Sequence, residues 1–339
     1  MHAKYFKHIL EFKQASGTSR GILHTKETYI LEIFDGDKKG IGECAVFRGL
    51  SFDDVPEYEE KLNWLCENIN ADFEFLKEKL KPFPSIWFGC EQAFLNLKHG
   101  SNLYFPSRFT EGKDSIKING LIWMGNSDFM EKQISEKLDA GFDCIKLKIG
   151  VDWDSEREIL KKLRQKFPKE KLELRVDANG GFGFEKAKSV LRELADLQIH
   201  SIEQPIKARS FDENHQSEMA KLCAETPVPI ALDEELIGVL NFNEKQKLLE
   251  NIKPQYIILK PALIGGFSGS DEWISIAEKL KIGWWITSAL ESNIGLNALA
   301  QYTFQKNPKI PQGLGTGALF TNNFETNLFL KNDKLYYKR

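Results

Sequence analysis

The sequence lacks several features that would place the chain in a specialised class. Its five cysteines are odd in number and scattered without a CxxC pair, which argues against a disulfide framework and against a zinc site. No apolar run approaches the roughly 18 residues that a membrane-spanning helix needs, and the opening MHAKYFKHILEFKQ alternates charged and apolar residues, unlike a signal peptide. The formal net charge of −3 gives no basic surplus for nucleic acid. We therefore expect a cytoplasmic protein that binds neither nucleic acid nor a membrane.

Charged residues recur at regular intervals along the chain, each at the end of a short apolar run. They are Lys148, Asp177, Glu203, Asp233 and Lys260. Their spacing of about 25–30 residues is that of one strand, one helix and two short loops, the repeating unit of an α/β barrel. Because such a barrel gathers its chemistry at the C-terminal ends of its strands, we expect these side chains to form one ring.

The rest of the pattern predicts two domains. Residues 1 to about 50 have the alternation of hairpin-forming strands, and two helices should follow, one opened by Ser51 and one that ends at Gly100. These segments predict an α+β domain over residues 1–112. A barrel over residues 113–317 should follow, and the hairpin-like segment 318–339 should return to the first domain. The expected barrel strands lie near 116–123, 143–149, 172–177, 199–203, 229–233, 256–260, 283–288 and 311–315, with a first helix over 127–140.

Strand geometry predicts that the charged ring faces inward. Successive side chains of a strand point to opposite sides, so Lys146 and Lys148 share one face while their apolar neighbours face the helices. Three lysines and three carboxylates would then meet at one mouth. Since burying an unpaired charge costs several kcal/mol, the six groups must pair with each other or with a ligand. A self-neutralising ion-pair network is one interpretation, and a divalent cation that relieves the repulsion among the carboxylates is the one that we favour.

The three carboxylates determine which ion we expect. Asp177, Glu203 and Asp233 offer only oxygen, and the six histidines of the chain fall away from the expected strand ends. Oxygen ligands favour a hard cation, so Mg²⁺ is expected, with Mn²⁺ as a second candidate. Asn179 and Glu234 stand next to these ligands in the sequence, where they either support the site or serve only their loops.

Lysines supply the expected acid–base chemistry. A bound cation makes the α-carbon of a substrate carboxylate more acidic, and a base must then stand beside that carbon. Lys148 suits this role, because crowding by Lys146 and by the cation favours a neutral amine. Lys260 comes from the far side of the ring and should lie opposite Lys148.

The motifs around these residues resemble the enolase superfamily. They are the KLK pair at 146–148, DANGGF after Asp177, EQP at Glu203, DEE at Asp233 and LKP around Lys260, and the last of these lysines resembles the muconate-lactonising-enzyme subgroup. The resemblance spans nearly the whole chain. It implies an α/β fold with a modified (β/α)7β TIM-like barrel and an N-terminal α+β capping domain. It also implies that the three carboxylates hold Mg²⁺ and that Lys148 and Lys260 flank the substrate carbon, with Lys146 in support.

Two loops separate the activities within the subgroup. Dipeptide epimerases usually carry an Asp-x-Asp in the last loop, whereas this chain has GLGTGALFTNN, with no acid before Glu325. Gly315 and Thr316 instead offer backbone N–H groups that suit an anion. Ser288 lies at the start of TSALESNIGLNALAQ, a segment expected to open a helix whose N-terminus can hold a carboxylate. Both loops favour a small dicarboxylate substrate.

The last loop resembles that of the o-succinylbenzoate synthases. This resemblance implies Mg²⁺-dependent dehydration of 2-succinyl-6-hydroxy-2,4-cyclohexadiene-1-carboxylate to 2-succinylbenzoate in menaquinone biosynthesis. N-succinylamino acid racemisation, dipeptide epimerisation and a non-catalytic binding barrel remain alternatives. The segment FRGLS at 47–51 is either a lid over the barrel mouth or ordinary packing between domains. No expectation about the oligomeric state follows from the sequence.

Overall fold

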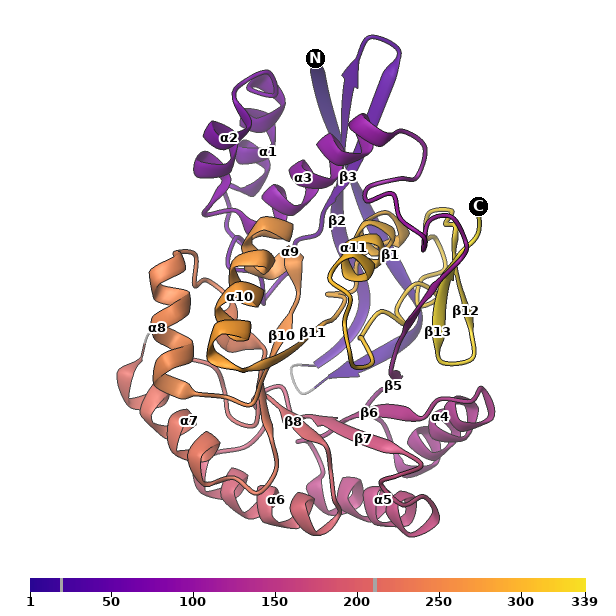
Figure 1. Ribbon diagram of the computed structural model, residues 1–339, viewed down its shortest axis with the longest axis vertical. Helices are drawn as coiled ribbons and strands as arrows, with labels where there is room; N and C mark the ends of the chain where they lie inside the picture. Colours follow the sequence, from indigo (N-terminus) through magenta and orange to yellow (C-terminus); the bar gives the residue numbers. More distant parts are fainter. Residues whose placement is uncertain (19–20, 210–211) are drawn as a thin grey trace.

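The computed structural model describes residues 1–18, 21–209 and 212–339. Its N-terminal part is an antiparallel sheet with three helices on one side (Figure 1). The sheet has the order β1 (His2–Thr18), β2 (Gly21–Asp35) and β3 (Lys38–Cys44), and the helices are α1 (Tyr58–Glu67), α2 (Phe73–Leu80) and α3 (Pro84–His99). Helix α3 packs directly on β3. The two backbones are so close at Gly42 that an added Cβ atom would lie 2.0 Å from the Gly89 carbonyl oxygen. The predicted hairpin strands and the helix end at Gly100 are confirmed.

The prediction of a helix that begins at Ser51 is wrong. The Ser51 hydroxyl accepts a hydrogen bond from the Phe47 backbone N–H, and Asp53 accepts two from Ser85. Because these polar side chains serve a turn and a neighbouring helix, neither is free to cap a helix of its own. Pro56 further disfavours helix at the residue before it, and α1 begins at Tyr58. Helix α2 was not predicted.

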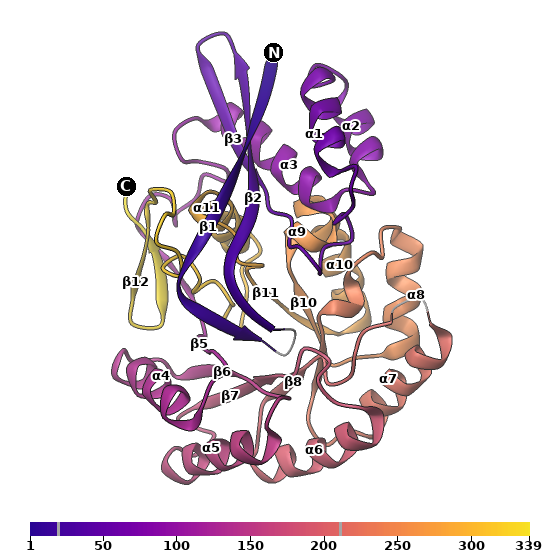
Figure 2. The same cartoon turned by 180° about the vertical axis from the view of Figure 1, so that it is seen from behind.

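The second part is a seven-stranded parallel sheet curled into a barrel, with helices on its outer side (Figures 1 and 2). The strands, in spatial order, are β5 (Gly120–Ile122), β6 (Cys144–Lys148), β7 (Glu173–Asp177), β8 (Ser201–Glu203), β9 (Ile230–Leu232), β10 (Tyr256–Leu259) and β11 (Gly283–Ile286). The helices are α4 (Ser127–Asp139), α5 (Trp153–Lys166), α6 (Phe184–Asp196), α7 (Glu213–Glu225), α8 (Phe242–Ile252), α9 (Pro261–Ile264), α10 (Gly266–Leu280) and α11 (Asn293–Gln305), with a 3-10 turn over Glu234–Leu236. The predicted α/β barrel with an N-terminal cap is therefore confirmed.

Along the barrel strands, successive side chains point to the sides that we expected. Val176, Ile202, Leu232 and Leu259 are buried in the main apolar cluster, whereas the charged residues beside them face the other way. The register aligns Lys148 with Asp177 and Asp177 with Glu203 on neighbouring strands. The strand ends therefore bring these charges together.

Two expected strands differ from the structure. The stretch 116–123 is divided into β4 (Ser115–Lys117), which lies outside the barrel sheet, and β5. The expected eighth strand at 311–315 is reduced to two isolated bridges, from Gln312 to Ile118 and from Gly313 to Thr287. The Gln312 side chain accepts a hydrogen bond from the Ile286 N–H, in place of a backbone carbonyl of a regular strand. These bridges close the ring between β5 and β11.

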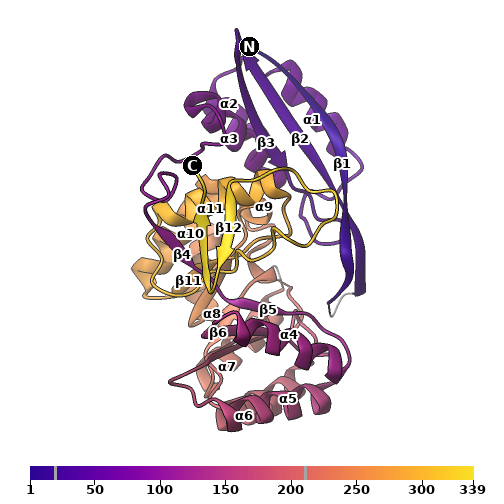
Figure 3. The same ribbon diagram turned by 90° about the vertical axis from the view of Figure 1, so that its right-hand side faces the viewer.

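The C-terminal segment lies against two parts of the molecule (Figure 3). Strands β12 (Leu328–Lys331) and β13 (Lys334–Tyr337) form a small sheet with β4. The residues before them run along β1, where the Lys13 N–H donates to Leu319 O and the Thr321 N–H donates to Glu11 O. The division of the chain at 112/113 and 317/318 remains our proposal. Among the described helices, none is long and apolar enough to cross a membrane.

A buried carboxylate joins the cap to the barrel. Glu43, at the end of β3, accepts hydrogen bonds from the N–H and hydroxyl of Ser292 and from the Gly295 N–H. These donors belong to the first turn of α11, whose positive dipole end favours an anion. Thr28 donates a further hydrogen bond to Glu43 from β2.

We expect Glu43→Ala to destabilise the protein by about 3–5 kcal/mol, because it leaves several buried donors without their anionic acceptor. Thermal unfolding followed by circular dichroism measures the effect, and Glu43→Gln, which keeps one acceptor oxygen, should lose less. Glu131→Ala is the control, since its ion pair with Lys162 is exposed, and its Tm should equal that of the wild type. A Glu43→Ala protein with an unchanged Tm would contradict this role.

Candidate active site

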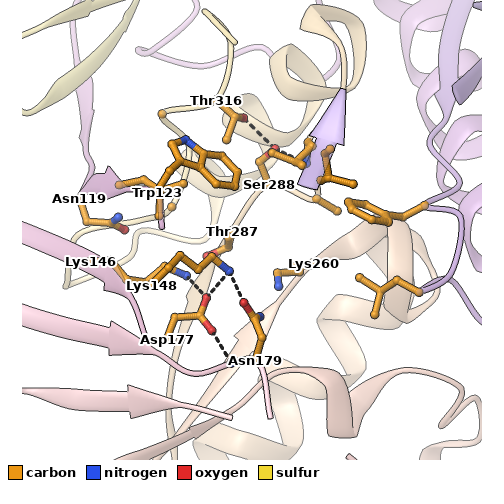
Figure 4. Close-up of a pocket in the computed structure, with 18 of the residues that line it drawn as sticks. Asn119, Trp123, Lys146, Lys148, Asp177, Asn179, Lys260, Thr287, Ser288 and Thr316 are labelled. Carbon is orange, nitrogen blue, oxygen red and sulfur yellow. Dashed lines mark hydrogen bonds and ion pairs between the residues drawn. The ribbon is translucent and has the colours of Figure 1, made fainter. Parts of the chain in front are cut away.

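A cavity of about 720 Å³, counted together with the solvent at its mouth, opens at the C-terminal ends of the barrel strands (Figure 4). Its polar wall comes from the strand ends and the last two loops: Asn119, Lys146, Lys148, Asp177, Asn179, Lys260, Thr287, Ser288, Gly315 and Thr316. Its apolar wall includes Leu23, Phe47, Leu50, Trp123 and Leu290. The cavity thus has charge at the barrel strand ends and hydrocarbon from both the cap and the barrel loops.

Lysine ammonium groups and carboxylates form a continuous network at the floor of this cavity. Lys146 Nζ lies 3.1 Å from Asp177 Oδ2 and 2.7 Å from Glu203 Oε2, and Lys148 Nζ lies 2.7 Å from Asp177 Oδ2. On the other side, Lys260 contacts Asp233 and lies 3.8 Å from Glu203 Oε1. All six side chains are buried. Lys148 and Lys260 enter the cavity from opposite sides (Figure 4).

Burial and charge compete in setting the protonation of these groups. Burial alone would raise the pKa of Asp177, but the ammonium groups of Lys148 and Lys146 outweigh it and lower that pKa. Burial would lower the pKa of Lys260, but the carboxylates of Asp233 and Glu203 raise it overall. Burial would likewise lower the pKa of Lys146, but the carboxylates of Glu203 and Asp177 raise it overall. Lys146 and Lys260 are therefore held as cations.

The carboxylates also meet the requirements of a hard divalent cation. Within the described residues, no three His, Cys, Asp or Glu side chains stand preassembled around a metal position, and the carboxylates are paired with lysines. Yet the donor set is all oxygen, and Glu203 Oε1 is buried with no hydrogen bond from any described residue. Such an oxygen is an available ligand. The residues present therefore fit an ion such as Mg²⁺.

Asn179 links the lysine side of the site to the loop after β9. Its Oδ1 accepts from Lys148 Nζ at 2.6 Å, and its Nδ2 donates to Glu234 Oε1 at 3.0 Å. Its backbone φ of 44° lies in the left-handed region, which is strained for a side-chain-bearing residue and is often found at functional sites. The structure thus brings both Asn179 and Glu234 to the network that the sequence analysis placed them near.

Gln204 is a contributor that the sequence analysis did not single out. It is fully buried, and its Oε1 accepts from the Asp233 N–H at 3.1 Å while its Nε2 donates to Glu235 Oε1 at 3.3 Å. His215 Nε2 is in turn 2.6 Å from Glu235 Oε1. These groups fix the backbone that carries Asp233. The only indication of this role in the sequence is that Gln204 follows Glu203 in the EQP motif. A single amide side chain has no sequence pattern that reveals its hydrogen-bond partners.

The last two loops meet at the end of the cavity. Thr316 Oγ1 donates to Ser288 Oγ at 2.8 Å (Figure 4), and Ser288 Oγ donates to Glu291 Oε2 at 2.5 Å. The hydroxyl proton of Ser288 is therefore committed inside the protein, which differs from the direct anion contact that its sequence position indicated. The backbone N–H groups of Gly315 and Thr316 have no hydrogen-bond acceptor among the described residues, so they are available to an anion.

The cap contributes part of the apolar wall of the cavity. Phe47 and Leu50, from the segment that the sequence left open between a lid and packing, both line it. The Phe47–Ser51 turn is closed by two backbone hydrogen bonds to Phe47 O. Leu23 joins them from β2. An α/β barrel with lysines facing each other across buried carboxylates, under an apolar cover, is an enzyme site for a small carboxylate substrate.

Comparison with known proteins agrees with this class. The family described as Enolase C-terminal domain-like matches residues 130–325. The o-succinylbenzoate synthase of Desulfotalea psychrophila (strain LSv54 / DSM 12343) is 42% identical over 361 aligned residues, covering 97% of this chain and 96% of the relative. The crystal structure of MenC from Desulfotalea psychrophila LSv54 superposes with a TM-score of 0.87 at 38% identity, covering 99% of each chain.

A more distant structure shares only the fold. The substrate-liganded L-Ala-D/L-Glu epimerase from Bacillus subtilis gives a TM-score of 0.84 at 18% identity, with 99% of this chain and 96% of the epimerase covered. The chain therefore belongs to the enolase superfamily and, within it, to the o-succinylbenzoate synthase family of lyases.

If Asp177, Glu203 and Asp233 ligate a divalent cation, as the sequence predicts, a chelator should abolish turnover and added Mg²⁺ should restore it. Asp233→Asn should weaken Mg²⁺ binding about tenfold or more, because an amide carries no charge and has one oxygen. Isothermal titration calorimetry measures the affinity. Asp271→Asn is the control, since Asp271 pairs with Lys306 away from the cavity. Full turnover in metal-free buffer would show that the expectation is wrong.

Proposed function

We propose that this protein dehydrates 2-succinyl-6-hydroxy-2,4-cyclohexadiene-1-carboxylate to 2-succinylbenzoate, as a cytoplasmic enzyme of menaquinone biosynthesis. The observation that carries the proposal is the pair Lys148 and Lys260, which face each other across the buried carboxylates of the barrel, in a chain 42% identical to an o-succinylbenzoate synthase. We propose Asp177, Glu203 and Asp233 as the ligands of Mg²⁺, with Mn²⁺ as a substitute. When bound, the ion supplies positive charge that stabilises the negative charge developing on the substrate carboxylate.

Lys148 is the proposed base and acid. Two short contacts, to Asp177 Oδ2 and Asn179 Oδ1, hold its Nζ at the cavity wall. In its neutral form the amine takes the proton from the carbon next to the ring carboxylate, and the electrons of that C–H bond move toward the carboxylate. As these electrons return, the C–O bond to the hydroxyl breaks and Lys148 gives its proton to the departing oxygen, which leaves as water. The ring becomes aromatic, which makes this step strongly favourable.

Lys260 acts as a fixed cation. Asp233 and Glu203 raise its pKa against the effect of burial, and we propose that it is an ammonium group on the face of the substrate opposite Lys148. Positive charge held at the point where negative charge develops stabilises the transition state. Lys146 forms ion pairs with Asp177 and Glu203 and so helps to hold these two carboxylates in place.

The last loop supports a dicarboxylate substrate over a dipeptide. Asp177 lines the cavity but already pairs with Lys146 and Lys148. The last loop carries no acid before Glu325, so a substrate ammonium held by that loop would lack a counter-charge. The free N–H groups of this loop instead suit the second carboxylate of the succinyl tail. N-succinylamino acids carry the same two carboxylates, and their racemisation is the second candidate function.

The two lysines should respond differently to substitution. Lys148→Ala should lower kcat by about 10²–10⁴-fold or more and should also abolish exchange of the substrate α-proton, because one group serves both steps. Lys148→Arg should be as inactive, since arginine stays protonated and cannot act as a base. Lys260→Arg keeps the cation and should retain more activity than Lys148→Arg. Retention of a tenth of the wild-type rate by Lys148→Ala would reassign the base.

Substrate preference tests the loop interpretation. We expect high kcat/KM for the cyclohexadiene carboxylate, weak or no racemisation of N-succinylamino acids and none of dipeptides. The measurement compares kcat/KM for the three substrates and uses deuterium uptake at the α-carbon to detect racemisation. Dipeptide epimerisation faster than dehydration would overturn the proposed function and leave the fold unaffected.

A further inference from the structure

Glu291 is a fully buried carboxylate behind the end of the cavity, in the loop between β11 and α11. Its Oε2 accepts from Ser288 Oγ at 2.5 Å and from the Ala289 N–H at 2.9 Å. Glu291 is not itself among the residues that line the cavity. Any effect on substrate must therefore pass through the groups that it holds.

Ser288 transmits this contact to the cavity wall. Its hydroxyl donates to Glu291, and its oxygen accepts from Thr316 Oγ1 at 2.8 Å and from the Leu290 N–H at 3.0 Å. A hydroxyl has one proton and two lone pairs, so Ser288 is fully used. Glu291, Ser288 and Thr316 thus form one chain with a fixed direction, which joins the loop after β11 to the last loop.

The backbone of the first loop needs such support. Leu290 lines the cavity with a φ of 63°, in the left-handed region that leucine rarely adopts. Strained conformations of this kind persist where the surroundings over-determine them, and they cluster at ligand sites. Hydrogen bonds to Glu291 and Ser288 hold the N–H groups of Ala289 and Leu290, and so fix this loop.

A buried lysine stands near the carboxylate. Lys26 of β2 is buried, and its Nζ has no hydrogen-bond partner among the described residues. Burial lowers the pKa of Lys26, and the nearby carboxylates of Glu43 and Glu291 oppose that fall. Burial raises the pKa of Glu291, and Lys26 opposes that rise. Glu291 Oε2 accepts from the Ala289 N–H as well as from the Ser288 hydroxyl, and this geometry sets the direction of the chain.

We propose that Glu291 is a positioning residue for a carboxylate subsite. Through Ser288 and Thr316 it holds the last loop so that the backbone N–H groups of Gly315 and Thr316 bind the carboxylate of the substrate's succinyl tail. This inference rests on the proposed function, because it names the part of the site that recognises the tail. It assigns specificity to a residue that does not touch the substrate.

A double-mutant cycle between Glu291 and Ser288 tests the inference, with Mg²⁺ and the cyclohexadiene carboxylate as substrate. Glu291→Leu and Ser288→Ala should each raise KM about tenfold, because both leave the loop groups without their partners, while kcat stays within about threefold. Calorimetric Kd values for the product 2-succinylbenzoate should rise in parallel. The double variant should have a KM no higher than the worse single variant, since the two residues act in series.

Two further variants separate positioning from general stability. Glu291→Gln keeps an oxygen that can accept from Ser288 and Ala289, so its KM should stay within about threefold of the wild type. Glu91→Leu removes another buried carboxylate at the boundary between the cap and the barrel, one that accepts from the Phe267 and Ser268 N–H groups away from the cavity. It should lower Tm without a change in KM.

The outcomes distinguish this inference from the proposed function. Independent effects in the cycle, with the two KM increases multiplying, or an unchanged KM in Glu291→Leu, would overturn it. If Glu291→Leu does not fold, Thr316→Val decides instead, because it breaks the chain at the cavity wall; a KM increase of about fivefold supports the inference, and an unchanged KM overturns it. Absence of turnover by the wild type overturns both proposals, whereas multiplying effects in an active wild type overturn this inference alone.

Discussion

Mutual neutralisation of buried lysines and carboxylates is the constraint on which the rest of the site depends. Asp177, Glu203 and Asp233 are almost completely buried, and an unpaired carboxylate in such a place would cost several kcal/mol. Lys146 and Lys148 offset that cost at Asp177, and Lys260 opposes it at Asp233, whose pKa burial still raises. The same six groups supply the acid–base chemistry of the proposed reaction, so that the stability of the barrel mouth and its chemistry rest on the same charges. A cation that binds there must compete with ammonium groups for the same oxygens.

The boundary between cap and barrel repeats this use of charge. Glu43 anchors β3 to the first turn of α11, and Glu291 holds Ser288 in the loop just before that helix. Lys26 stands near both carboxylates. The cap therefore does more than cover the cavity with Phe47 and Leu50, because its buried charges reach the loop that lines one end of the site. Substrate recognition at that end depends on contacts between parts of the chain that are some 250 residues apart.

The sequence predicted those parts of the fold and site that repeat. The strands near 143–149, 172–177 and 256–260 and their inward charges follow from the period-2 pattern and the regular interval between the units. It failed where polar side chains serve distant partners. Ser51 closes a turn and does not cap a helix, and the expected strand at 311–315 becomes two bridges around Gln312. Such choices depend on which groups meet in the folded chain, and local propensity does not contain that information.

By itself the sequence determined the barrel, the inward direction of the six charges and the family of enzymes to which the chain belongs, because alternation and spacing are local properties that survive without any knowledge of contacts. Only the tertiary structure decided which lysine pairs with which carboxylate, that Asn179 holds Lys148, and that the Ser288 proton is turned inward to Glu291. Hydrogen bonds act over about 3 Å, so their partners are fixed only once the strands, loops and cap have been brought together.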